Sequence, residues 1–213
     1  MLSFSYILTL IFIIIFILYL IGININKCPR KVKIFFSIAF ILLFIRYIAI
    51  LLGALIDSQA IIYCLRPIVL LNYSLTPLLA LCTAYIFLRN EDTPFNYNFI
   101  FMVILLLLYV WEVYIYKINI SINNSFGFII NFKESLKPDL IYLIVISSTA
   151  IVSLLCVDKP FCNKLGMRLL TISLMITITE FILFLGGIKI LPYPFIGEIL
   201  ILLMSFKAIK TFK

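Results

Sequence analysis

Charged residues inside long apolar runs are the first candidates for chemistry in this sequence. Arg46 stands in FILLFIRYIAILLG, residues 40–53, and Glu180 stands in ITITEFILF, residues 176–184. A lone arginine at the centre of a bilayer costs at least about 2.5–3.5 kcal/mol, so it is expected to face other helices and to find an acidic partner. Counting about 1.5 Å per residue along each helix places both residues at a similar depth. We therefore predict that Arg46 and Glu180 form a buried pair.

Four further polar residues complete the predicted ligand-binding or switch set. Arg66, Glu112 and Glu198 are expected nearer the outer surface, where they could floor or rim a cavity. Asn72 is expected to turn toward the same interior. A purely structural clamp is the leading alternative for the buried pair, and a path for protons or ions is another. Snorkelling toward the interface would also explain Arg66 and Glu112 without a ligand, so these alternatives stay open.

The residue types exclude much of enzyme chemistry. The chain contains no histidine, so Ser/His and Cys/His nucleophile pairs and the HExxH zinc site have no residue to use. It also contains neither GxxxxGK[ST] nor GxGxxG, the two common nucleotide-binding fingerprints. The spacing in CVDKPFC, residues 156–162, does not suit a zinc site. We expect no enzymatic activity, no cofactor and no bound metal.

The elements that must position these residues follow from the composition. The chain is 65% hydrophobic and only 12% charged, with a mean hydropathy of +1.24, which is typical of an integral membrane protein. We predict one all-α membrane domain, residues 1–213, built as a bundle of about seven transmembrane helices. The predicted helices are Phe4–Gly22, Ile34–Leu55, Ile68–Leu88, Phe99–Tyr116, Leu140–Cys156, Leu169–Gly186 and Leu191–Phe206.

The positions of lysine and arginine predict the orientation in the cell membrane. Basic loops stay on the cytoplasmic side, and an outer N-terminus with a cytoplasmic C-terminus puts most basic residues there. The residues placed inside are Lys27, Arg30, Lys31, Lys33, Arg89, Lys159, Lys164, Arg168, Lys207, Lys210 and Lys213. This bias explains the net charge of +8, so the expected partner of the basic loops is the lipid bilayer and not nucleic acid.

One loop between the fourth and fifth predicted helices has a strand-like pattern. KINISINNSFGFIINF, residues 117–132, contains two alternating segments around Asn123, Asn124 and Ser125. Such a pattern predicts a short outer β-hairpin that could cap a pocket. An irregular loop fits nearly as well, because a two-stranded ribbon alone is only marginally stable.

Three stretches resemble the seven-helix membrane sensor region at the N-terminus of bacterial histidine kinases and diguanylate cyclases. LLNYSLTPLLALCTAYIF, residues 70–87, is similar to the third helix of that family, and residues 117–132 are similar to its loop between helices four and five. LPYPFIGEILILLMSFKAIKTFK, residues 191–213, resembles its proline-led last helix. Members of the family continue into a cytoplasmic output domain, whereas this sequence ends at Lys213. The resemblance therefore implies signalling through a membrane or cytoplasmic partner protein.

Two functions from different classes are expected. The first is a free-standing sensor-like module that binds a small ligand in its outer half and passes a helix shift to a partner. The alternative is the membrane-embedded, substrate-capturing subunit of a transporter. Such subunits typically have six helices and a stripe of small residues on the first, where FSYILTLIFIIIFILYL, residues 4–20, has bulky ones.

Overall fold

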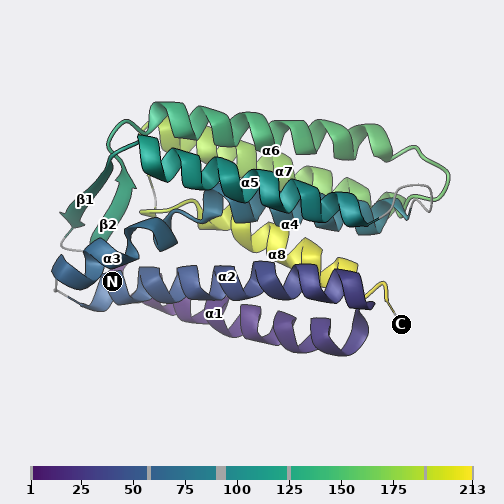
Figure 1. The fold of residues 1–213 in the computed structure, drawn as a ribbon, viewed down its shortest axis with the longest axis horizontal. Coiled ribbons are helices and arrows are strands. Elements are labelled where there is room, and N and C mark those ends of the chain that lie inside the picture. Colours follow the sequence, from purple (N-terminus) through teal and green to yellow (C-terminus); the bar gives the residue numbers. More distant parts are fainter. Residues whose placement is uncertain (1, 57–58, 90–94, 124–125, 190, 213) are drawn as a thin grey trace.

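The computed structural model describes residues 2–56, 59–89, 95–123, 126–189 and 191–212, which form mainly α-helices (Figure 1). The elements are α1 (Leu2–Lys27), α2 (Arg30–Leu55), α3 (Gln59–Val69), α4 (Asn72–Leu88), α5 (Asn96–Ile115), β1 (Ile118–Asn123), β2 (Gly127–Phe132), α6 (Leu136–Cys156), α7 (Lys164–Leu185) and α8 (Phe195–Ile209). Within these residues, six spans are long and apolar enough to cross a membrane, with α3 and α4 together forming one of them. The expectation of a helical, multi-pass membrane protein is supported to that extent.

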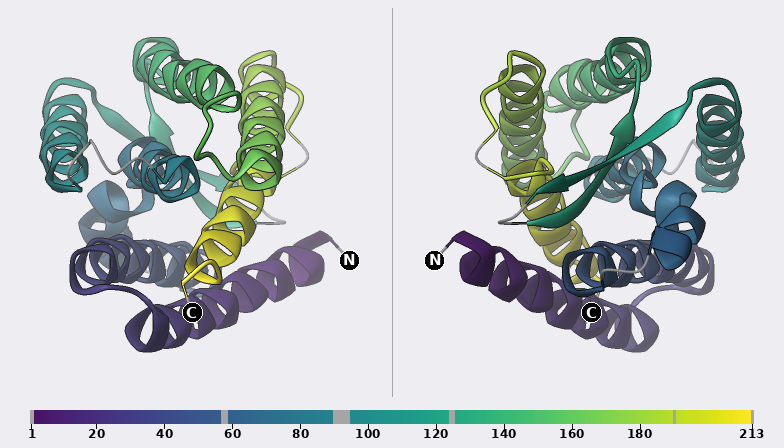
Figure 2. Two further views of the ribbon diagram at one scale, coloured as in Figure 1. Left: turned by 90° about the vertical axis from the view of Figure 1, so that its right-hand side faces the viewer. Right: turned by 90° about the vertical axis from the view of Figure 1, so that its left-hand side faces the viewer.

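α4 lies at the centre of the bundle. It contacts α2, α5, α6, α7 and α8, while α1 packs mainly on α2 at the edge of the molecule (Figures 1 and 2). This arrangement follows from composition, because the outer helices expose apolar side chains and α4 buries most of its surface. A helix that is apolar on all sides can pack in the interior of a bundle or face lipid.

The third predicted helix is interrupted, which corrects the prediction of one segment, Ile68–Leu88. α3 ends at Val69 and α4 begins at Asn72. Pro67 has no backbone N–H and cannot bond the carbonyl four residues before it, and the end of α3 at Val69 leaves its last carbonyl groups without helical partners. Two side chains supply donors, because the Tyr109 hydroxyl donates to the Pro67 carbonyl and Arg46 donates to that of Val69. The break is thus compatible with an apolar interior.

The last helix is shorter and later than the predicted Leu191–Phe206. α8 has 15 residues, which corresponds to a length of about 22 Å, less than the ~30 Å of a bilayer core. Pro192 and Pro194 precede it, and α8 begins directly after Pro194. Figure 2 shows α8 crossing the bundle obliquely between α7 and the α1–α2 pair. It is therefore a tilted internal helix and not one of the six long spans.

The predicted hairpin is confirmed between α5 and α6. β1 and β2 pair antiparallel, with Ile118 opposite Phe132 and Asn123 opposite Gly127, while Asn124 and Ser125 lie outside the described residues. The inner face of β2 is buried, and its strand crosses the end of the bundle that carries the N-terminus (Figures 1 and 2). This packing gives the ribbon the support that an isolated hairpin lacks.

Two contacts hold the hairpin on the helices. The backbone N–H of Ile130 donates to the Tyr193 hydroxyl at 3.0 Å, which ties β2 to the segment before α8. Gly127 has a φ of +77°, and a Cβ there would lie 2.8 Å from the carbonyl oxygen of Gly53 and from the Cα of Ala54. Only glycine fits both the left-handed backbone and this close approach to the end of α2.

α7 and α8 approach each other closely at Gly197. A Cβ at this position would lie 2.5 Å from Oγ1 and 2.7 Å from Cβ of Thr177 on α7. Because Cβ is fixed to the backbone, side-chain rotation cannot relieve this contact, and the two helices would have to separate. The position of the first turn of α8 therefore depends on glycine.

We expect Gly197→Ala to destabilise the fold by about 1–3 kcal/mol, the usual cost of overpacking a close helix contact. Thermal unfolding in detergent measures the change. Gly22→Ala is the matched control, since a Cβ at Gly22 on α1 meets nothing within 4 Å and should not lower the melting temperature. Thr177→Gly should restore part of the loss in the double variant. Equal melting temperatures for Gly197→Ala and the wild type would contradict the contact.

Candidate functional site

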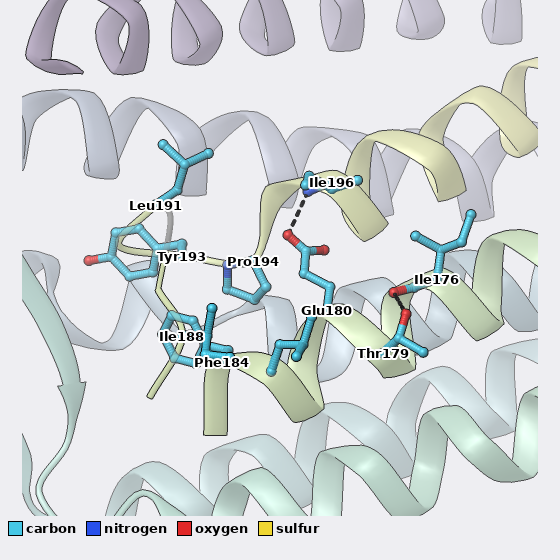
Figure 3. Close-up of a pocket in the computed structure, with 10 residues that line it drawn as sticks. Ile176, Thr179, Glu180, Phe184, Ile188, Leu191, Tyr193, Pro194 and Ile196 are labelled. Atoms are coloured by element: carbon cyan, nitrogen blue, oxygen red, sulfur yellow. Dashed lines mark hydrogen bonds between the residues drawn. The ribbon is translucent and has the colours of Figure 1, made fainter. Parts of the chain in front are cut away.

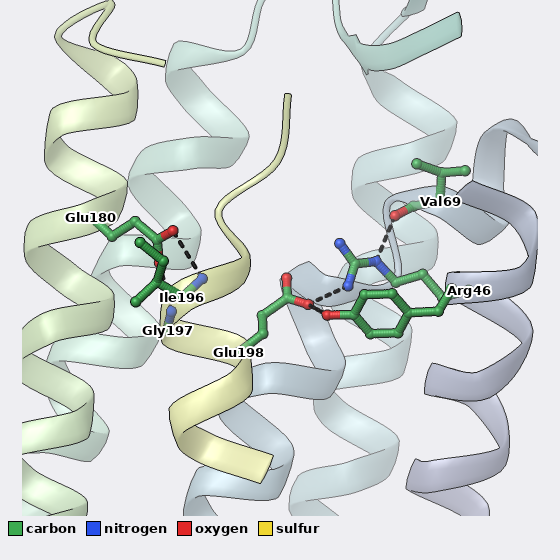
Figure 4. Close-up of polar contacts among 7 residues, drawn as sticks. Arg46, Val69, Glu180, Ile196, Gly197 and Glu198 are labelled. Atoms are coloured by element: carbon green, nitrogen blue, oxygen red, sulfur yellow. Dashed lines mark hydrogen bonds and ion pairs between the residues drawn. The ribbon is translucent and has the colours of Figure 1, made fainter. Parts of the chain in front are cut away.

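Arg46 is completely buried and pairs with Glu198, the first-turn acid of α8. Its Nη1 lies 2.5 Å from Glu198 Oε2, and the two side chains are 0% and 4% exposed. Its Nε donates to the Val69 carbonyl at 2.8 Å. The guanidinium thus joins α2 to α8 and to the break between α3 and α4 (Figure 4). Within the described parts of the chain this is the one ion pair.

The pair extends to a neighbouring tyrosine. The Tyr47 hydroxyl donates to the same oxygen of Glu198 that Arg46 contacts, so Glu198 Oε2 accepts from two groups on α2. The second oxygen of Glu198 and Arg46 Nη2 are buried and have no partner among the described residues. A narrow void beside Tyr47, Thr76 and Glu198 does not admit a water-sized molecule. Glu198 Oε2 therefore accepts two hydrogen bonds, whereas Glu198 Oε1 and Arg46 Nη2 have no partner among the described residues.

Glu180 is not the partner of Arg46, which corrects the predicted pair. Its two carboxylate oxygens accept from the backbone N–H groups of Ile196 at 3.0 Å and Gly197 at 2.6 Å. Figure 4 shows α8 between Glu180 on α7 and Arg46 on α2. Depth along a helix gives no information on the direction in which a side chain points around the helix axis. α8 intervenes and offers Glu198 to Arg46.

Glu180 acts as a cap for α8. The first N–H groups of a helix have no partner within the helix, and the helix dipole places partial positive charge there. A carboxylate that accepts two of these N–H groups satisfies both needs. Because Pro194 precedes the helix and gives no side-chain cap of its own, α8 depends on an acid from α7 for this role.

A cavity of about 240 Å³ adjoins this cap. It lies between α7, the segment before α8 and the start of α8, and Figure 3 shows Glu180 among its lining residues. The lining is mainly apolar and consists of Ile176, Thr179, Glu180, Leu183, Phe184, Ile188, Leu191, Tyr193, Pro194 and Ile196. A largely apolar cavity with few polar groups is the usual form of a small-molecule site.

Tyr193 links this cavity to the hairpin. It lines the cavity and its hydroxyl accepts from the Ile130 N–H of β2. Burial raises the pKa of Tyr193 to about 12, so the phenol is neutral at physiological pH. Its hydroxyl can therefore accept from the hairpin and still carry a proton to donate.

The outer charges predicted to floor or rim a cavity have different contacts. Glu198 is bound to Arg46, whereas the Arg66 guanidinium stacks on the Tyr63 ring, 3.6 Å from its centroid. Glu112 on α5 is 1% exposed, and neither of its carboxylate oxygens has a partner among the described residues. None of these contacts joins two of the three residues, so their gathering around one cavity stays a prediction.

The remaining predicted residue, Asn72, is buried as the first residue of α4. Sequence reasoning missed three polar residues that matter here. These are Tyr47, Tyr193 and Asp139, whose carboxylate accepts from the Tyr73 hydroxyl. Asp139 was not predicted because the expected helix began at Leu140, whereas α6 begins at Leu136 and includes it.

No protein-family model matches the chain, and no curated protein matches it significantly. Among the described residues, no three acidic or cysteine side chains gather in a way that could hold a metal ion. The site is therefore interpreted from its own geometry, which combines a buried ion pair, a capped internal helix and an adjoining apolar cavity.

A double-mutant cycle on Arg46 and Glu198 tests the ion pair through the free energy of unfolding. Arg46→Met strands the Glu198 carboxylate, and Glu198→Gln strands the guanidinium, so each change should cost about 3–5 kcal/mol. The double variant should recover much of the loss, because partnered sites do not add. Thermal unfolding in detergent provides the measurement.

Glu180→Gln combined with Arg46→Met is the control for this cycle. Glu180 bonds the start of α8 and not Arg46, so these two losses should add. Recovery in this combination, together with additive losses for Arg46 and Glu198, would restore the original pairing and refute the one described.

Proposed function

We propose that the protein is a sensor-like membrane module that binds a small ligand in the cavity beside Glu180 and signals through a partner protein. The observation that carries this proposal is the double role of Glu180, which lines the cavity and caps α8. The cavity volume of about 240 Å³ and its apolar lining favour a small, mainly apolar molecule. A hydrogen-bond donor on that molecule would be directed to the carboxylate.

In this proposal, the ligand and the backbone N–H groups at the start of α8 compete for the Glu180 carboxylate. A ligand that donates a hydrogen bond to Glu180 weakens the bonds to Ile196 and Gly197, and thereby loosens the first turn of α8. A ligand shifts an equilibrium only if it binds two states with different affinities. Here the two states are the capped and the uncapped start of α8, and a ligand that needs the Glu180 carboxylate binds the uncapped state better. α8 carries the shift across the bundle toward the C-terminal end, where Ser205 contacts Thr83 at 3.1 Å.

The hairpin end faces outward in this proposal. The opposite end of the bundle holds the basic residues that flank α1, α2, α4, α7 and α8 (Figure 1). Lysine and arginine in short loops favour the cytoplasmic side. The cavity then opens in the outer half of the protein, and the C-terminal end of α8 lies near cytoplasmic partners.

A transport role is the alternative that one observation favours. The third span is interrupted between Val69 and Asn72, and discontinuous helices are common at the binding sites of transporters. The partner separates the two functions. Affinity capture of the intact protein from its native membrane should retrieve a kinase-like or cyclase-like protein for a sensor, and a transport ATPase for a substrate-capturing subunit.

The orientation is tested by thiol labelling of whole cells. In a background with all five cysteines changed to alanine, a membrane-impermeant maleimide should label Ser121→Cys on exposed β1 without permeabilisation. It should label Lys159→Cys, in the turn between α6 and α7, only after the membrane is opened. The reverse pattern would reject the outward-facing hairpin.

The cap predicts a local effect of Glu180→Gln. The amide keeps one acceptor and loses the charge, so amide hydrogen exchange at Ile196 and Gly197 should accelerate roughly tenfold, as expected for loss of a charge-assisted hydrogen bond. Exchange elsewhere in the bundle should stay unchanged. Glu134→Gln, at an exposed carboxylate after β2, is the matched control.

The same measurement tests the ligand response. A panel of small apolar amines, alcohols and amides should include compounds that accelerate exchange at the start of α8 in the wild type and not in the cavity-filling variant Ile176→Trp. If no compound in the panel acts, or if both proteins respond alike, the cavity is not a sensing site.

A further inference from the structure

A second and larger cavity lies at the opposite end of the molecule from the hairpin. Its volume is about 410 Å³, and it is formed where α2 begins, α4 ends and the chain enters α5. Phe212, which follows α8 near the C-terminus, completes the wall. This cavity shares no lining residue with the one beside Glu180.

Three cationic side chains line this second cavity. Arg30 and Lys31 come from the first turn of α2, and Arg89 follows the last residue of α4. All three residues are exposed, and Lys31 Nζ is anchored by a 3.0 Å hydrogen bond to Asn96 Oδ1. The first turn of α2 has no side-chain cap, so it adds backbone N–H groups and the positive end of the helix dipole.

The rest of the lining is apolar. Val32, Ile86 and Phe95 are buried, while Tyr85 and Phe212 are partly exposed. A cationic edge over an apolar floor matches a molecule with an anionic head and a hydrocarbon body. A free phosphate would use the charges but would leave the apolar floor empty.

We propose that this cavity binds one anionic phospholipid, with its phosphate at Arg30, Lys31 and Arg89 and the start of its acyl chains on the apolar floor. The location supports this occupant, because the cavity lies at the ends of three membrane-crossing spans, the level of lipid headgroups. Basic pockets between helices on the cytoplasmic side are suited to such headgroups. The site does not depend on the proposed sensing function.

General attraction of basic loops to anionic lipid is the competing explanation. The chain offers a matched control, since Lys159, Lys164 and Arg168 are three exposed basic residues at the same end that do not line the cavity. Removal of either triad changes the net charge by the same amount. A built site and a diffuse charge effect therefore predict different results.

The experiment uses the full-length protein, delipidated in a neutral detergent and titrated with short-chain phosphatidylglycerol or phosphatidylcholine. Thermal stabilisation and native mass spectrometry measure binding. The wild type should bind one phosphatidylglycerol in preference to phosphatidylcholine. Changing Arg30, Lys31 and Arg89 together to glutamine should weaken this binding roughly tenfold or more, because each basic residue near an anionic headgroup contributes substantially to affinity. The control triad, changed to glutamine, should stay within about twofold of the wild type.

Several results would overturn the assignment. Equal weakening in the two triads would show diffuse surface charge, and equal binding of the two lipids would exclude headgroup recognition. Inorganic phosphate that displaces phosphatidylglycerol at millimolar concentration and stabilises the protein equally would identify a phosphate site instead. If the triple variants do not fold, Arg89→Gln and Lys159→Gln are compared by the same criteria, with a loss expected only for Arg89→Gln.

Discussion

The burial of one arginine in an apolar interior is the constraint on which much of this structure depends. Arg46 is fully buried, so its charge requires partners within the protein. Glu198 supplies the opposite charge, and the Val69 carbonyl accepts a further hydrogen bond. The Arg46 side chain therefore holds the first turn of α8 against α2 and gives a hydrogen-bond donor to a carbonyl at the break between α3 and α4. Tyr47 strengthens the arrangement by donating to the shared carboxylate oxygen.

The helices were largely predictable because hydrophobic length is a strong signal. Their ends were less so, since Lys27 and Arg30 continue helices beyond the apolar runs. A proline alone does not predict a helix break, because Pro67 precedes a break whereas Pro77 lies inside the continuous helix α4. Tyr109 donates to the Pro67 carbonyl, and a single sequence does not reveal such tertiary partners.

The charged members of the buried network were predictable, but their pairing and the tyrosines around them were not. Arg46 and both glutamates were identified because charges in apolar runs are costly and rare. The choice between Glu180 and Glu198 required the direction in which each side chain points and the position of α8, which begins at Phe195 and not at Leu191. These depend on packing between helices far apart in sequence. The cap on α8 had no sequence signal, because its donors are backbone groups.

The distance in sequence between Arg46 and Glu198 has a consequence for biosynthesis. The two residues are 152 positions apart, so a ribosome that adds about 5–20 residues per second makes the acid about 8–30 s after the arginine. The Val69 carbonyl arrives much earlier and gives the guanidinium a provisional partner. Until α8 is made, the nascent protein carries an uncompensated charge among apolar helices. The last helix thus completes the electrostatic balance of the second.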